Sequence, residues 1–120
     1  MDWDIKTDTT LGEKVYHAAL DPGPALYVLP RGGYNKKYAI FSTRFGSIDN
    51  NFRIEGDGGA EEIKVPDGVA HFLEHKLFDD EEGNAFDKFA RYGASSNAFT
   101  GFTSTTYLFS CTDYFQESFE

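Results

Sequence analysis

Cysteine and basic residues are scarce in this chain of 120 residues. The one cysteine, Cys111, cannot form an internal disulfide, so we expect a reducing, cytoplasmic environment. It lies in an apolar, strand-like run and is expected to be a small buried residue. Only 11 Lys and Arg stand against 20 Asp and Glu, which gives a formal net charge of -9. Such a charge disfavours nucleic acids and anionic membrane surfaces as partners, because their phosphates attract cations.

Long hydrophobic runs are missing as well. No stretch approaches the ~20 apolar residues that a transmembrane helix needs. The first four residues lack the basic and apolar regions of a signal peptide. Aromatic residues, in contrast, are abundant, with 12 Phe and 7 Tyr. They predict a globular chain, residues 1–120 as a single domain, with an aromatic core or an apolar face for something outside the chain.

Histidine is rare too, yet two of the three histidines lie in His71-Phe72-Leu73-Glu74-His75. Each residue of an α-helix advances about 100°, so His71, Glu74 and His75 leave one face within an arc of about 100°. Two imidazoles at this spacing can bind one Zn²⁺, and a carboxylate beside them can take a proton from an attacking water. The order H-x-x-E-H is the inverse of the commoner zinc-protease motif H-E-x-x-H.

The H-x-x-E-H pattern has a simpler interpretation, a surface helix with two solvated histidines. Random placement of three His and nine Glu would produce it in roughly one chain in 200. Its flanking residues argue against free solvation, because they are too apolar for a solvated helix. These residues are Ala70, Phe72, Leu73, Leu77 and Phe78. Ionisable groups on a half-buried face need a partner or a metal, since burial otherwise costs free energy.

The pattern of polar and apolar residues predicts strands first, then helices, then strands again, in the order β-β-β-α-α-β-β-α. Blocks of strands and blocks of helices indicate an α+β fold with a mostly antiparallel sheet and helices packed on one face. The first three strands are expected to form an antiparallel meander, after an irregular arm. The predicted strands are 14–20, 25–30, 37–45, 95–100 and 105–111, and residues 101–104 are expected to link the last two as a hairpin. The arm is 1–12, and 46–62 is a loop or irregular hairpin.

The predicted helices cover residues 68–78, 85–92 and 114–120. Asp67, Asn84 and Asp113 are expected as their N-caps, because short polar side chains accept hydrogen bonds from the first free backbone N–H groups. Gly93 is expected to end the second helix. The acidic run 79–82, which precedes that helix, is expected to be a solvated turn. The third helix has no C-cap and no basic last turn, so we expect that the chain has been cut there.

Three stretches of the sequence resemble the pitrilysin family of zinc metallopeptidases, which includes insulin-degrading enzyme and the mitochondrial processing peptidases. They are residues 68–78, residues 93–100 and Thr106-Tyr107. The match is nearest to bacterial members, and it implies that residues 1–120 are the N-terminal, C-terminally truncated part of a peptidase domain. By this resemblance His71 and His75 are zinc ligands and Glu74 is the general base.

The resemblance also implies a substrate site. Asn97, Ala98 and Phe99 would lie on a sheet edge facing the zinc, where a peptide substrate adds as an extra strand through its main-chain groups. The family's third zinc ligand is a Glu on a later helix, farther along the chain than the 45 residues that follow His75. The family also needs a second, similar half, as part of one chain or as a subunit of a homo- or hetero-oligomer. The chain alone is therefore expected to be inactive.

Two functions from different classes remain open at the level of the sequence. The first is part of a zinc metalloendopeptidase that hydrolyses peptides with Glu74 as general base. The alternative is a non-catalytic module of the same fold that binds peptides or proteins. A structural zinc site fits less well, because such sites use four ligands that usually include Cys. A cysteine nucleophile fits poorly, since no activating base lies near Cys111.

Overall fold

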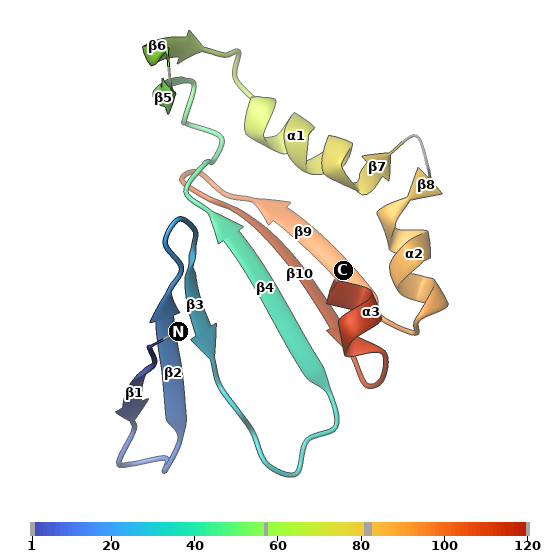
Figure 1. The fold of residues 1–120 in the computed structure, drawn as a ribbon. Helices are drawn as coiled ribbons and strands as arrows, with labels where there is room; N and C mark the ends of the chain where they lie inside the picture. Colours follow the sequence, from blue (N-terminus) through green and yellow to red (C-terminus); the bar gives the residue numbers. More distant parts are fainter. Residues whose placement is uncertain (1, 57, 81–82, 120) are drawn as a thin grey trace. The chain divides into compact units, whose positions relative to one another are not determined.

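The computed structural model describes residues 2–56, 58–80 and 83–119. Backbone contacts divide the chain into two units, Met1–Tyr34 and Asn35–Glu120. Figure 1 shows the elements of both units. No helix of the described ranges is long and apolar enough to cross a membrane.

The first unit is an antiparallel sheet of three strands in the order β1-β2-β3. Ile5 pairs with Tyr16, and His17 pairs with Tyr27. The prediction of an irregular arm over residues 1–12 is therefore wrong for residues 4–7, which form a strand. All four residues of this strand are exposed, so the sequence lacks there the alternation of apolar and polar residues that predicts a strand. The strands are β1 (Asp4–Thr7), β2 (Lys14–Ala19) and β3 (Ala25–Val28).

The second unit contains an antiparallel sheet in the order β4-β10-β9. Its strands are β4 (Lys37–Thr43), β9 (Ser95–Thr100) and β10 (Thr105–Cys111). The expected meander is wrong in its third member, since β4 pairs with β10, with Ile40 opposite Leu108. A local pattern shows that a segment is a strand, but it does not show which distant segment will be its partner. The predicted hairpin at 101–104 is confirmed by the bond from Gly101 N to Ser104 O, 2.8 Å.

Two smaller ladders complete the strands of the second unit. The segment predicted as a loop or irregular hairpin contains a regular hairpin, β5 (Asn51–Gly56) and β6 (Gly59–Lys64). The acidic run expected to be a turn begins with β7 (Asp79–Asp80), which pairs with β8 (Gly83–Asn84). The other two residues of that run, 81 and 82, lie outside the described ranges.

The helices are α1 (Val69–Phe78), α2 (Ala85–Arg91) and α3 (Phe115–Phe119). The N-cap of α2 is confirmed, because the Asn84 side chain accepts a hydrogen bond of 2.8 Å from Phe86 N. Gly93 follows α2 with a φ of 67° and donates to Ala90 O at 3.0 Å, as expected of a residue that ends a helix.

The other two predicted N-caps are wrong by one position each. Helix α1 begins at Val69, directly after Gly68, and the carboxylate of Asp67 accepts a hydrogen bond from Asn50 Nδ2 at 2.9 Å. Helix α3 begins after Tyr114, which has a φ of 55°, so Asp113 is one residue too early. The exact start of a helix depends on the dihedral angles of neighbouring residues, which composition alone does not fix.

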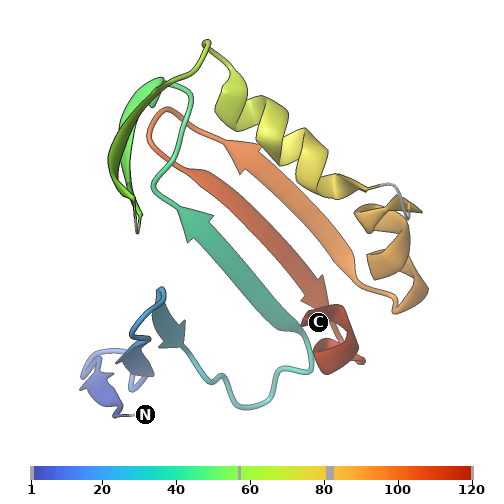
Figure 2. The same cartoon turned by 45° about the horizontal axis from the view of Figure 1, so that its top comes forward.

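The core of the second unit lies where the helices meet one face of the β4-β10-β9 sheet. Phe109 is buried with Ala94 and Cys111, and the rings of Phe89 and Phe115 lie 5.3 Å and 5.5 Å from its ring. Cys111 is only 3% exposed, which confirms the predicted burial. All three helices contact this face, as Figure 2 illustrates for α1 beside β9, and the α+β class is confirmed.

Candidate metal centre

Helix α1 carries the two motif histidines one turn apart. Their Nε2 atoms are 3.0 Å apart and their ring centroids are separated by 4.7 Å. The helix follows Gly68, whose φ of 87° suits glycine, and Phe72 N donates to Gly68 O at 2.9 Å in the first turn. The helical period therefore places both imidazoles on one exposed face.

The spacing of the two Nε2 atoms fits a shared metal ion. Zinc binds imidazole nitrogen at about 2.0–2.1 Å, so two such ligands at a tetrahedral angle are about 3.3 Å apart. The observed 3.0 Å is close to that span, and both rings are exposed enough to rotate slightly. In the described ranges no group of three or more His, Cys, Asp or Glu side chains could hold a metal. Among the described residues, His71 and His75 are therefore the candidate metal ligands.

Glu74 is oriented by a strand rather than by its own helix. Thr100 Oγ1, at the end of β9, donates a hydrogen bond of 2.5 Å to Glu74 Oε2. Both side chains are half-buried, whereas His71 and His75 are exposed. The motif helix thus directs its histidines to solvent and its carboxylate towards the sheet.

Tyr107 is the second sheet residue that interacts with the Glu74 carboxylate. Burial raises the pKa of its phenol above the usual 10.0, and the negative charge of Glu74 raises the pKa further. Its ring lies 5.9 Å from the ring of Phe78, at the end of α1. Tyr107 pairs with Ala98, and Thr105 pairs with Thr100, so Tyr107 and Thr100 share the sheet face that α1 covers.

The residues predicted to bind substrate all lie on β9, which pairs only with β10 among the described strands and is an edge strand. The structure separates them by face. Ala98 is half-buried on the face of Thr100, whereas Asn97 and Phe99 are exposed on the other face. Asn97 Oδ1 accepts a hydrogen bond of 2.9 Å from Ala98 N. Substrate binding by the three residues stays a prediction.

Sequence reasoning gave no role to Thr100 or Tyr107. Both residues lie within the stretches that resemble the family, but neither is a metal ligand or a common catalytic base. The alternation along β9 was the available signal, since Ser96, Ala98 and Thr100 share one face. That signal does not identify the residue of α1 that would meet Thr100.

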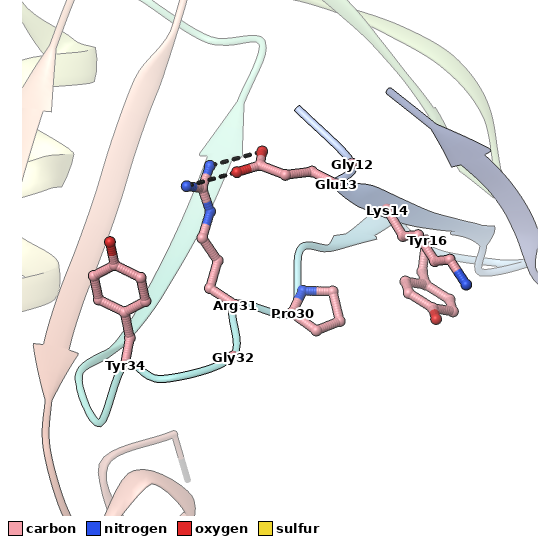
Figure 3. A pocket seen from close by; sticks show the side chains of 8 residues that line it. All are labelled: Gly12, Glu13, Lys14, Tyr16, Pro30, Arg31, Gly32 and Tyr34. Atoms are coloured by element: carbon pink, nitrogen blue, oxygen red, sulfur yellow. Dashed lines mark hydrogen bonds and ion pairs between the residues drawn. The ribbon is translucent and has the colours of Figure 1, made fainter. Parts of the chain in front are cut away.

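A separate hollow lies within the first unit (Figure 3). Arg31 forms two contacts with Glu13, Nη1 to Oε1 at 2.8 Å and Nη2 to Oε2 at 2.9 Å. This pairing compensates the charges of Arg31 and Glu13 locally. The hollow is lined by Gly12, Glu13, Lys14, Tyr16, Pro30, Arg31, Gly32 and Tyr34. The third histidine of the chain, His17, also lies in the first unit, where its ring packs on that of Tyr27 with centroids 4.7 Å apart.

Comparison with known proteins shows to which family the chain belongs. The model of the insulinase family, peptidase family M16, matches residues 56–119. The chain belongs to this family. The family resemblance seen in the sequence is thereby confirmed, and the match includes the motif helix and β9.

Three similar proteins show how much of this chain, and how much of their own length, the similarity covers. "Uncharacterized zinc protease YmfH" of Bacillus subtilis (strain 168) is 51% identical over 110 residues, which are 92% of this chain and 25% of that protein. "Putative zinc protease AlbF" of the same strain is 42% identical over 65 residues, 54% of this chain and 14% of AlbF. The crystal structure titled "putative M16-like peptidase from Alicyclobacillus acidocaldarius" matches with a TM-score of 0.78 and 39% identity, covering 89% of this chain and 24% of that one.

This chain corresponds to only part of each of these proteins. The chain spans about a quarter of the length of YmfH and of the M16-like structure.

Proposed function

We propose that this chain supplies the motif helix of a zinc-dependent endopeptidase. The observation that carries the proposal is the 3.0 Å separation of His71 Nε2 and His75 Nε2 on α1, with Glu74 on the same helix. His71 and His75 hold Zn²⁺ through these nitrogens, in their neutral forms. The third protein ligand comes from outside the chain, so the chain by itself is inactive.

In this proposal the bound metal and Glu74 have separate chemical roles. Bound Zn²⁺ supplies Lewis-acid activation of water and of the scissile carbonyl. Glu74 takes the proton of the attacking water and passes it to the leaving amine, as a general base and then a general acid. Its Oε2 is already engaged by Thr100, so Oε1 is the oxygen that we assign to the proton transfer.

The substrate in this proposal is a peptide that pairs with the open edge of β9. An edge strand offers unpaired N–H and C=O groups, and an extended peptide satisfies them as an added strand. Asn97, Ala98 and Phe99 are the residues that we assign to this contact. The complete enzyme is proposed to act in the cytoplasm, with a second peptidase-like half in the same chain or in a homo- or hetero-oligomer.

Zinc binding by this chain is the first test. Calorimetry at about pH 7.5 should show stoichiometric binding of Zn²⁺. The affinity should be weak, because two histidines leave the other positions to water. The double variant His71→Ala, His75→Ala should lose this binding, whereas the control His17→Ala should keep it. Equal binding by the double variant and the unchanged chain would place the metal elsewhere.

The role of Glu74 is tested on the full-length protein that carries this sequence. Glu74→Gln should lower the rate of hydrolysis of a quenched fluorescent peptide by about 10²–10⁴-fold, the usual contribution of a general base. Its zinc content should not change, because Glu74 is not a ligand in this proposal. An unchanged hydrolysis rate would remove Glu74 from the mechanism.

A non-catalytic role in binding peptides is the second candidate function. The open edge of β9 favours it, since strand addition needs no metal. Strong and specific peptide binding by the His71→Ala, His75→Ala variant, together with an inactive full-length protein, would support this role over hydrolysis.

A further inference from the structure

We infer that Thr100 is a positioning residue that holds Glu74 in the orientation needed for proton transfer. The inference deepens the proposed function and rests on it. It assigns a role to a side chain that is neither a ligand nor a base, on a strand 26 residues from Glu74 in sequence.

Glu74 needs such a partner because of its length. A glutamate has three rotatable side-chain bonds, and on a helix surface it samples several rotamers. The bond from Thr100 Oγ1 to Glu74 Oε2 is short, 2.5 Å, and partly shielded from water. A hydroxyl donating to an ionised carboxylate makes a stronger bond than a neutral pair does. The carboxylate therefore stays in one orientation relative to the two histidines.

Thr100 is itself well fixed. Its backbone lies in the ladder between β9 and β10, opposite Thr105. A β-branched side chain has few χ1 rotamers, so the direction of its hydroxyl follows from the backbone. Thr105, in turn, donates from Oγ1 to Phe45 O at 2.7 Å. The sheet thus provides a rigid support from which the orientation of Glu74 is set.

One hydroxyl has one proton, so Thr100 can donate to only one carboxylate oxygen. Oε2 receives this bond, and Oε1 stays available to accept a proton from water. Thr100 is neither a proposed zinc ligand nor one of the residues assigned to the peptide. Its loss should therefore lower kcat and leave KM and zinc content as they are.

The experiment compares Thr100→Val and Thr100→Ser in the full-length protein, loaded with zinc. Valine keeps the shape of threonine and removes the hydroxyl, and we expect kcat to fall about 10-fold or more, since small misplacements of catalytic groups are costly. Serine keeps the hydroxyl and should restore most of kcat. KM and zinc content should match those of the unchanged protein in both variants.

The matched control is Thr106→Val. Thr106 shares a side-chain hydrogen bond of 3.0 Å with Ser42, on the opposite face of the same sheet. Its valine variant removes a partly buried threonine hydroxyl without touching Glu74, so kcat per zinc-loaded protein should not change. An equal loss of kcat in Thr106→Val and Thr100→Val would show a general effect on the sheet and overturn the inference.

The outcomes separate this inference from the proposed function. If Glu74→Gln abolishes hydrolysis while Thr100→Val keeps the unchanged kcat, the inference is wrong and the proposed function stands. A loss of kcat in Thr100→Ser as large as that in Thr100→Val would also overturn it, because the hydroxyl would not matter. If hydrolysis is absent in the unchanged protein, or survives Glu74→Gln, both fall.

Discussion

At the scale of single residues, the surroundings of Glu74 combine one hydrogen-bond donor with one aromatic neighbour. Thr100 donates to its Oε2, and Tyr107 has its pKa raised by burial and by the charge of Glu74. Neither residue was assigned a role from the sequence. Glu74, His71 and His75 could be grouped from the sequence, because their relation depends only on the helical period.

The raised pKa of Tyr107 predicts a change of stability at alkaline pH. The folded state holds the phenol proton more tightly than the unfolded chain, whose tyrosine has the usual pKa of 10.0. The resulting stabilisation is present in full below pH 10.0 and is lost as the pH rises through the folded pKa. Urea unfolding between about pH 8 and 11 should therefore show a steeper loss of stability for the unchanged chain than for Tyr107→Phe.

The control for this titration is Tyr38→Phe, which changes a tyrosine that is 59% exposed on the other face of the same sheet. Its stability should follow the unchanged chain across the same pH range. Identical pH dependence of Tyr107→Phe and the unchanged chain would contradict the assigned environment of Tyr107.

At the scale of elements, the connection after β4 depends on a close approach of two backbones. Ser47 N donates to Gly101 O at 2.9 Å and Ile48 N donates to Phe102 O at 3.1 Å. A Cβ atom at Gly46 would lie 2.5 Å from Ser104 N, inside the turn between β9 and β10. Glycine at position 46 therefore reflects a lack of space and not an unusual φ.

Gly46→Ala should destabilise the second unit by about 1–3 kcal/mol, because the clash is with backbone that can move only by distorting the turn. The control Gly58→Ala adds a Cβ that meets nothing within 4 Å, and its effect should stay within about 0.5 kcal/mol. Urea unfolding followed by circular dichroism measures both. Equal stabilities for the two variants would contradict the close approach.

At the scale of the whole molecule, the helices of the second unit pack on one face of the β4-β10-β9 sheet. Tyr38, Ile40 and Phe99 point to the face opposite the helices and are 59%, 59% and 53% exposed. Exposed apolar faces and open strand edges promote association between chains. The aromatic richness of the sequence predicted either an aromatic core or such a face, and the register of the sheet shows which residues form the face.

We expect this chain on its own to self-associate through that face. Sedimentation velocity should show dimers or larger species that grow with concentration, and Ile40→Thr should reduce them. Ile54→Thr is the matched control, because Ile54 is 51% exposed but lies on the separate β5-β6 hairpin. A monomer at high concentration would contradict the prediction.

Local periodicity is enough to predict α1 with its three motif residues, α2 with its Asn84 cap, and the β9-β10 hairpin. Each depends on residues a few positions apart, where helix and strand geometry fix the side-chain directions. The partner of β4 and the partner of Glu74 depend on segments that are distant in sequence. Ile40 meets Leu108, and Glu74 meets Thr100, only because the folded chain brings them together. Such contacts arise from the packing of whole elements, and no local pattern encodes them.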